Sequence, residues 1–376
     1  MRIPVAWLNI IQHKKRTCAA LAGISFSIFL IFMQLGFLGA TRKNATIVYD
    51  YLDFDLLIVS EQFLTLTRAG SVDRYRLLQS EALQEVESVT GVLVGMADWL
   101  NEEADKEKNL LIFGVDPDKF FFTNEALKQQ GHLLAGRSSI LVDSRVMPDF
   151  GPWEVGEVRQ VNEQPVSVVG GYQMGVGILA TGSAFVSYET FSRLNGGDTT
   201  TSYNLGLVKL KPGSDVLKTR EALLNALPGD VLVKTREEIT TSEEHFYIGV
   251  KPVGIMFKIG AVVSFIVGAV MLYQILSAEI TNRLNEFATM KAIGYNTLYI
   301  YKIGIQQGIL FSMLGFIPAL ILSYLLYWSI HSVSGFYLVM TLSRASFVFV
   351  LSLLMCAIAG ALSLGKIRKA DPADLF

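Results

Sequence analysis

Four long apolar stretches, one near the N-terminus and three near the C-terminus, constrain the fold of this 376-residue chain most strongly. They cover Thr17–Ala40, Ile259–Ala278, Ile303–Ile330 and Ala345–Leu364, and none contains Asp, Glu, Lys or Arg. A bilayer core about 30 Å thick needs about 20 apolar residues of helix, and a charge at its centre costs on the order of 2.5–3.5 kcal/mol. The sequence therefore predicts an integral membrane protein with four transmembrane helices.

Charged residues are divided unevenly between these stretches and the block of residues 41–250 that follows the first of them. The block has 30 Asp and Glu against 19 Lys and Arg, a net charge of −11, whereas the rest of the chain has 4 against 13, a net charge of +9. Ten basic residues flank the stretches on the side of both termini, and five flank them on the opposite side. Because cytoplasmic flanks carry the excess of Lys and Arg, we expect both termini in the cytoplasm and the acidic block outside the inner (plasma) membrane.

The residues before the first stretch predict a short amphipathic helix that lies in the plane of the membrane. Ile3, Trp7, Ile10 and Ile11 form an apolar stripe ahead of a basic cluster that ends at Arg16. The alternative is a cleavable signal peptide, but the first stretch is longer than the 7–15 apolar residues usual for one. The predicted segments are a cytoplasmic elbow helix (1–16), transmembrane helices (17–40, 253–278, 303–330 and 345–365), an external domain (41–250), a cytoplasmic coupling helix and loop (279–302), a short external loop (331–344) and a cytoplasmic tail (366–376).

The external block has the pattern of an α/β domain. Short runs rich in Val, Leu and Ile alternate with segments whose apolar residues recur every three to four positions, as strands and amphipathic helices do. We expect two βαβ-like units, a β-rich insertion carried farther out, and a helical stalk that is broken before the second stretch by Pro252. The units are strand 55–60, helix 72–86 and strand 91–99, then strand 204–210, helix 214–227 and strand 230–234; the insertion includes strands 110–114 and 140–143 and the alternating segment 157–187; the stalk covers 237–249.

The sequence has no motif for catalysis, for a cofactor or for a metal. It contains no G-x-x-x-x-G-K-[ST] phosphate loop, no H-E-x-x-H and no G-x-S-x-G, and its four histidines are widely scattered. The basic residues lie at the membrane flanks rather than on a soluble face, so nucleic-acid binding is not predicted. A transport path through the bilayer would be expected to display intramembrane charges. We therefore expect a non-catalytic membrane subunit that does not form a polar channel.

The segment between the second and third stretches predicts an amphipathic helix that ends at a glycine. Its apolar residues recur at i, i+3 and i+6, and its Glu and Arg residues are spaced to form pairs along the helix. One interpretation is a helical hairpin that lies on the inner leaflet. The other is a docking element for a cytoplasmic partner that accepts a helix in a groove. The residues expected to make that contact are Glu279, Arg283, Glu286, Phe287, Met290, Ile293 and Gly294.

The segment Asn282–Gly294 resembles the E-R-x-x-E-I-(G/A)-x-x-x-A-(I/L)-G coupling signature of the MacB/FtsX-like ABC transporter permease family. The basic entry Lys14–Ile24 and the ending Lys366–Leu375 also resemble that family, as does the one-plus-three order of the spans. Asn282 and Asn285 depart from the signature at positions where charged residues are usual. Within the family, the chain is most similar to the DevC type, in the segments Pro4–Leu8, Phe32–Phe37 and Val115–Pro117.

The resemblance implies an α/β membrane protein whose external domain is periplasmic and MacB-like, with two porter halves and a sabre-like insertion. It implies an efflux system that works by mechanotransmission: a separate cytoplasmic ATPase subunit binds ATP and Mg²⁺, while this chain binds no cofactor. The other implied partners are a periplasmic adaptor (membrane fusion protein), a TolC-like outer-membrane duct, membrane lipid and a second copy of the chain. The adaptor is expected to contact residues 110–200, and the implied cargo is a lipid, a glycolipid or another hydrophobic molecule.

Two other functions fit the same resemblance. One is an FtsX-like regulator of a cell-wall hydrolase, against which the large size of the external block argues. The other is a LolC/LolE-like subunit for lipoprotein release, which would need a lipid-accepting cavity between two permeases.

Overall fold

The computed structural model describes residues 14–119, 121–196, 201–282, 289, 293, 297–334 and 336–369. These residues fall into two compact units. The membrane unit contains the described residues up to 38, 255–329 and from 338 onward, and the external unit contains 39–254 and 330–337. The elbow helix predicted for residues 1–16 lies outside the described residues, apart from its last three, which begin the first described helix.

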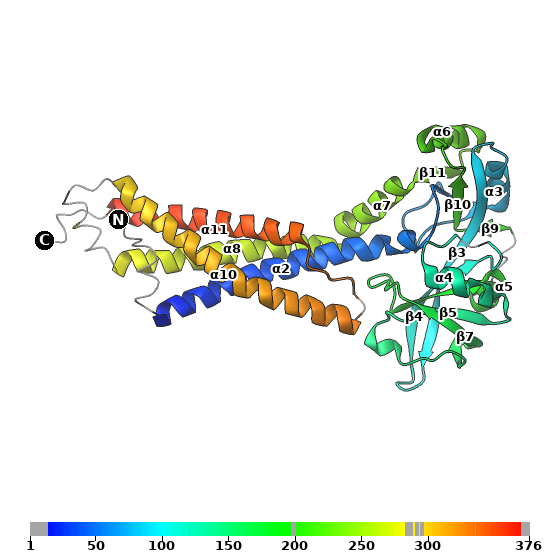
Figure 1. Cartoon of the computed structure of the whole chain (residues 1–376), viewed down its shortest axis with the longest axis horizontal. Coiled ribbons are helices and arrows are strands. Elements are labelled where there is room, and N and C mark those ends of the chain that lie inside the picture. The colour runs from blue at the N-terminus through cyan, green and yellow to red at the C-terminus, as the bar shows by residue number, and fades with distance from the viewer. Residues whose placement is uncertain are drawn as a thin grey trace. The chain divides into compact units, whose positions relative to one another are not determined.

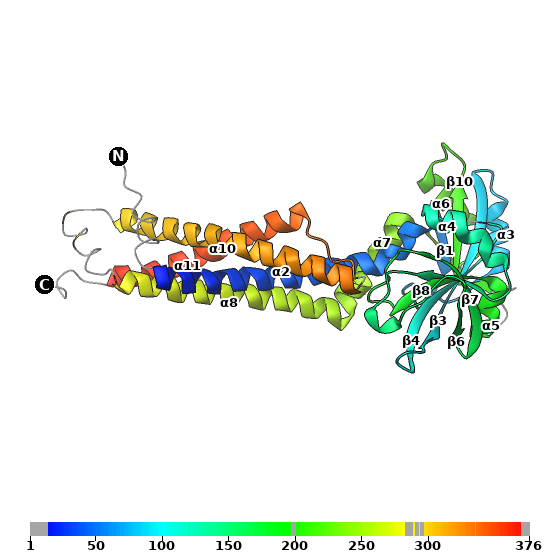
Figure 2. The same ribbon diagram turned by 60° about the horizontal axis from the view of Figure 1, so that its bottom comes forward.

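The membrane unit is built from four long helices that lie alongside one another in both views (Figure 1 and Figure 2). They are α2 (Lys14–Tyr51), α8 (Pro252–Asn282), α10 (Thr297–Ser334) and α11 (Leu342–Lys369). Each contains one of the predicted apolar stretches, and each is long and apolar enough to cross a membrane. The prediction of one N-terminal and three C-terminal spanning helices is confirmed.

The interior of this helix bundle is apolar and tightly packed. Phe32 of α2, Leu272 of α8 and Met355 of α11 are fully buried in one cluster. Small residues make this packing possible: a Cβ atom added at Gly268 would lie 2.4 Å from the sulfur of Met355. Between membrane helices, close packing of this kind replaces the hydrophobic driving force that operates in water.

Helix α2 is longer than the apolar stretch that predicted it, because it continues past Ala40 to Tyr51. In this last part Asn44, Ala45 and Val48 are buried, whereas Arg42 is exposed. The uniformly apolar pattern stops at Ala40 because residues 39–51 pack within the external unit, where buried polar residues such as Asn44 and Thr46 stand among the apolar ones.

The external unit is organised around a nine-stranded sheet with the order β11-β1-β10-β3-β4-β8-β5-β7-β6. Two further short strands, β2 (Val72–Asp73) and β9 (Ser202–Tyr203), form a separate pair. The strands of the large sheet are β1 (Leu56–Ser60), β3 (Val86–Asn101), β4 (Lys106–Val115), β5 (Ser139–Asp143), β6 (Val158–Val161), β7 (Gln164–Tyr172), β8 (Gly182–Ser187), β10 (Leu205–Leu210) and β11 (Val231–Thr235).

The two predicted βαβ-like units are present, but they interleave in one sheet instead of forming separate halves. The first unit is β1, α3 (Arg74–Glu81) and β3; the second is β10, α6 (Val216–Ala226) and β11. β1 is antiparallel to both β10 and β11, and β10 is antiparallel to β3, so each unit has a strand of the other between its own two strands. The pairing partners of a strand depend on contacts far away in the chain, which a local pattern does not contain.

The helix predicted for residues 72–86 is shorter than expected. Val72 pairs with Tyr203 in the small sheet, and the side chain of Asp73 caps α3 by accepting a hydrogen bond from Tyr75 N at 2.8 Å. At the other end, Val86 begins β3 and pairs with Leu210. The helical pattern of this segment thus includes apolar residues that belong to a strand on either side.

Both faces of the β1 end of the sheet are covered, so every residue of β1 is buried. Leu56 and Ile58 lie in one core cluster with residues of α3 and α6, and Leu57 and Val59 lie in another with residues of α2 and α7. Helix α7 (Arg236–His245) and the last turns of α2 therefore pack on one face. Because side chains alternate along a strand, β1 supplies apolar residues to both faces.

Strand β3 belongs to both parts of the sheet. Its first residues, up to Val92, pair with β10, and from Leu93 onward it pairs with β4. The second part contains β4, β8, β5, β7 and β6, and β6 returns to β3 through the pair Trp99–Val161. Trp99 is buried and stacks on Phe150 at 4.6 Å between ring centroids. The β-rich insertion predicted for this part of the chain is confirmed.

The remaining described elements of the external unit are short helices. They are α4 (Glu125–Gln130), η1 (Gly131–Ala135), η2 (Pro148–Phe150), α5 (Tyr188–Asn195) and η3 (Phe246–Val250).

Gly91 is required where β3 changes partners, which leads to a testable prediction. A Cβ atom at this position would lie 2.3 Å from the ring of Tyr203. We expect Gly91→Ala to lower the free energy of unfolding by about 1–3 kcal/mol because the ring is forced out of place. In a Tyr203→Ala background the same change should cost less than about 1 kcal/mol. Denaturant titration of the full chain in detergent, followed by tryptophan fluorescence, measures both; equal costs in the two backgrounds would contradict this explanation.

Candidate functional site

The residues predicted to form a cytoplasmic docking surface lie mostly outside the part of the chain that the structure describes. Arg283, Glu286, Phe287, Met290 and Gly294 are all outside the described residues.

Two residues of that surface have a described backbone. Glu279 lies in the last turns of α8, and the N–H of Ile293 donates to the carbonyl of Thr289 at 3.0 Å. Ile293 itself is exposed. The docking role of this segment stays a prediction.

In the external unit, the two helices through which the chain enters and leaves the sheet meet at one place. α2 leads into β1 at Leu56, and β11 leads directly into α7 after Thr235. Leu56 and Thr235 are paired across the two neighbouring strands. We call the contact between residues 42–54 and α7 the joint. It connects both helices to the same end of two adjacent strands.

Helix α7 begins at a capping box. The Thr235 hydroxyl accepts a hydrogen bond from Glu238 N at 3.2 Å, while the Glu238 carboxylate accepts one from Thr235 N at 2.9 Å. Such reciprocal caps satisfy N–H groups that the first turn leaves unpaired. The buried stripe of the helix then consists of Ile239, Glu243 and, in the following turn, Tyr247, at i, i+4 and i+8. The stalk predicted for residues 237–249 is helical, and a bend at Lys251 separates it from α8.

Arg236, the first residue of α7, binds the carbonyl end of α2. One guanidinium nitrogen donates to Leu52 O at 2.8 Å and to Phe54 O at 3.1 Å, and the other donates to Tyr49 O. The guanidinium carbon lies 4.0 Å from the centre of the Phe54 ring. The last carbonyls of a helix have no partner within the helix and carry partial negative charge. Arg236 therefore fastens the last turn of α2, at Tyr49, and the segment that follows the helix, at Leu52 and Phe54, to α7.

A second buried contact of the joint involves a carboxyl group. Glu243 of α7 is 0% exposed. Its Oε1 atom accepts hydrogen bonds from the Tyr49 hydroxyl at 2.9 Å and from Leu66 N at 2.5 Å. Burial raises the pKa of Glu243 to about 7, and the hydrogen bonds from Tyr49 and Leu66 act in the opposite direction. The neighbouring residue, Glu244, forms a more exposed ion pair with Arg42 of α2 at 3.1 Å.

β11 is the edge strand at this end of the sheet, and a side chain of α6 contacts it. Arg220 of α6 donates from Nε to Val233 O at 3.0 Å and pairs with Glu238 of α7 at 3.1 Å. These residues line a groove of about 690 Å³ between the two helices. Covering an edge strand with a helix protects it from pairing with another strand, and here Arg220 of α6 occupies the Val233 carbonyl of β11.

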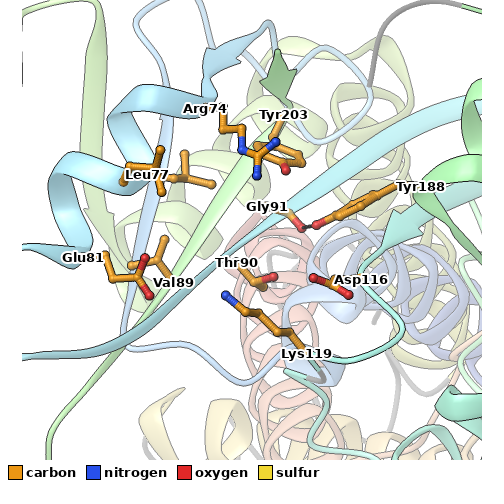
Figure 3. Close-up of a pocket in the computed structure, with 11 residues that line it drawn as sticks. Arg74, Leu77, Glu81, Val89, Thr90, Gly91, Asp116, Lys119, Tyr188 and Tyr203 are labelled. Carbon is orange, nitrogen blue, oxygen red and sulfur yellow. Dashed lines mark hydrogen bonds between the residues drawn. The ribbon is translucent and has the colours of Figure 1, made fainter. Parts of the chain in front are cut away.

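A smaller hollow lies where β3 changes partners (Figure 3). Its volume is about 100 Å³, and polar groups of Thr90, Asp116 and Lys119 gather around it. The Tyr188 hydroxyl donates to Gly91 O at 2.6 Å and ties the two parts of the sheet together. Small-molecule sites usually measure about 300–1,000 Å³. This hollow is therefore too small for a lipid-like cargo.

Among the residues that the structure describes, no group of three or more His, Cys, Asp and Glu side chains could hold a metal ion.

The joint was not predicted from the sequence, although one signal for it is present. Along residues 236–247 the positions that a helix buries are occupied by Arg236, Ile239, Glu243 and Tyr247. Two charged residues on the apolar side of a short helix indicate buried polar contacts, since such residues are almost never buried unpaired. Their partners in α2 are more than 180 residues away in the sequence, so the pattern alone does not identify them.

Known families match most of the chain. Residues 17–226 match the family described as MacB-like periplasmic core domain, and residues 258–372 match the FtsX-like permease C-terminal family. No curated protein sequence matches the chain.

Among solved structures, the chain is similar to the periplasmic region of MacB from Actinobacillus actinomycetemcomitans, with 11% identity and a TM-score of 0.38 over 52% of this chain and 95% of that one. It is also similar to the extracellular domain of the noncanonic ABC-type transporter YknZ from Gram-positive bacteria, with 15% identity and a TM-score of 0.33 over 48% of this chain and 99% of that one.

The role of Arg236 can be tested by replacing its guanidinium with an apolar chain of similar length. Arg236→Met leaves the carbonyls of Tyr49, Leu52 and Phe54 without their charged donor, and hydrogen bonds to charged groups contribute about 1.5–3 kcal/mol. We expect amide hydrogen exchange in residues 47–51 to become about 30-fold faster, since 2 kcal/mol corresponds to that factor. Arg137→Met, at an exposed position, is the control. Unchanged protection in Arg236→Met would show that the joint does not depend on this side chain.

Proposed function

The chain belongs to the MacB/FtsX-like permease family of ABC transporters, and from that premise we propose that it exports cargo by mechanotransmission. In this mechanism a cytoplasmic ATPase moves the membrane helices, and the helices move the external domain. The joint is the observation that carries the proposal, because there the helix that enters the sheet and the helix that leaves it are fixed to each other and to adjacent strands. The absence of charged residues from the four apolar stretches supports a lever rather than a polar channel.

The force would enter through the segment 279–294. The sequence has no phosphate loop of its own, so ATP and Mg²⁺ belong to a separate ATPase subunit. Arg283, Glu286, Phe287 and Met290 are proposed to dock that subunit. Displacement of this segment would move α8, and through the bend at Lys251 it would reach α7 and the joint.

The rest of the system is proposed from the resemblance to DevC-type permeases. Two copies of the chain form a C₂ dimer, since two ATP sites form between two ATPase subunits. A periplasmic adaptor contacts the β-rich part of the external unit around residues 110–200, and a TolC-like duct continues the path across the outer membrane. The cargo is a lipid, a glycolipid or another hydrophobic molecule that the external domains push into the adaptor.

Co-purification of the full chain tests this assignment against the alternatives. Recovery of an ATPase together with an adaptor and a duct protein supports export. Recovery of an ATPase with a cell-wall hydrolase would replace it with an FtsX-like regulatory role, and recovery with lipoproteins would favour release of the LolC/LolE type.

The docking role of the cytoplasmic segment predicts a specific loss of coupling. Arg283→Glu reverses the charge of the expected contact, and Met290→Asp places a charge on its apolar side. Each should reduce ATPase binding or stimulation by about tenfold or more, since a tenfold change corresponds to 1.4 kcal/mol. The measurement is ATPase activity with the full permease in nanodiscs, with Arg137→Glu on the external unit as the control. Full stimulation in both variants would rule out the docking role.

A further inference from the structure

We propose that Glu243 makes the joint sensitive to pH: the joint is tight when its carboxyl group is protonated and loosens when the group ionises. The structural claim stands on the contacts of Glu243 alone. Its consequence for transport rests on the proposed function, because it would make the connection between the membrane helices and the external domain tighter at low pH than at high pH.

The geometry of the carboxyl group favours the neutral form. Glu243 is 0% exposed, and both donors that reach it, the Tyr49 hydroxyl and Leu66 N, bind the same oxygen, Oε1. The other oxygen, Oε2, is buried with no hydrogen-bond partner among the described residues. An ionised carboxylate needs donors at both oxygens, and leaving one of them unpaired in the interior is costly. A proton on Oε2 removes the charge that this oxygen would otherwise carry.

The charged and titratable groups around Glu243 do not neutralise it. Lys234 of β11 acts on it from a distance, but its amino group donates to Ser242 Oγ at 3.2 Å and lies 5.5 Å from the centre of the Phe63 ring. Within the described residues, no Lys or Arg forms an ion pair with Glu243, although its neighbour Glu244 pairs with Arg42.

The other facing titratable groups, Tyr49 of α2 and Tyr247 of η3, are neutral at physiological pH. Arg68 of the loop after β1 is charged, and it acts on Tyr247, whose hydroxyl bonds to Thr65 and Thr67. Burial is thus the dominant influence on Glu243, and it raises the pKa of this group to about 7.

The sign of the effect follows from proton linkage. In the closed joint the carboxyl group keeps its proton up to about pH 7, whereas in an open, hydrated joint it loses the proton near its ordinary value. The closed joint therefore binds more protons than the open one in this window. The stability that this proton gives to the closed joint is fully present below the ordinary pKa of a glutamic acid. It falls as the pH rises and is lost above about pH 7. From about pH 6 to about pH 8, linkage predicts an increase of about tenfold in the opening equilibrium.

Hydrogen exchange of the full chain in nanodiscs, at about pH 6 and about pH 8, tests the proposal without an ATPase. After correction for the intrinsic pH dependence of exchange, amides of residues 236–250 should open about tenfold more often at the higher pH. In Glu243→Gln, which keeps the shape but cannot ionise, opening should be equal at both values. Glu237→Gln, the same change at an exposed position of the same helix, should behave as the parent chain does.

A second variant keeps the test decisive if the Gln variant does not fold. Tyr49→Phe removes a donor that lowers the pKa of Glu243, so the midpoint of the opening curve should move to higher pH. Opening that is independent of pH in the parent chain would overturn the proposal, as would equal pH dependence in Glu243→Gln or an unmoved midpoint in Tyr49→Phe. None of these readouts depends on ATPase coupling. The proposal can therefore fail while the transport mechanism stands, and the transport mechanism can fail while the proposal stands.

Discussion

The external unit depends on how the carbonyl end of α2 is satisfied. A buried helix end needs partners for its last carbonyls. At this end the carbonyl of Tyr49 accepts from Arg236, the first residue of α7, while those of Asp50 and Tyr51 accept from Thr123. The two helices cannot separate without leaving backbone groups unpaired in an apolar setting. Since α2 continues into β1 and α7 follows β11, the same contact fixes the helices to neighbouring strands. One side chain thereby joins the beginning and the end of the external unit.

The sheet connects the joint to the rest of the external unit. β1 lies between β11 and β10, is covered on both faces, and is followed across the sheet by β3. Because β3 pairs first with β10 and then with β4, the part of the sheet next to the joint and the β-rich part share one continuous strand. The interleaving of the two βαβ-like units means that neither can move without the other. In the proposed mechanism, displacement at the joint would reach the β-rich part through paired strands rather than through a loop.

Sequence patterns predicted what depends on local composition. The four spans follow from apolar runs without charges, and the strands of the insertion follow from alternation, so both were found. Where a residue's partner is distant, the pattern was insufficient: it did not show that β10 lies between β1 and β3, and it assigned Val86 to a helix although this residue pairs with Leu210. Glu243 was missed for the same reason, because its donor Tyr49 lies in the extension of α2 that no apolar run marks. The docking role of Arg283 and Met290 still rests on the amphipathic pattern and the resemblance, because both residues lie outside the described part of the chain.

The lengths of the helices favour a lever over a helix that only crosses the bilayer. α2 has 38 residues, and at 1.5 Å per residue it is about 57 Å long, whereas a bilayer core is about 30 Å thick. An unbroken helix transmits displacement along its axis only if its end is held, and Arg236 holds this end from α7. The ion pair of Arg42 and the contacts of Glu243, whose charges would be costly inside the spans, thus lie where α2 has left its apolar stretch. A carboxyl group that titrates near neutral pH can modulate the connection there without placing a charge in the bilayer.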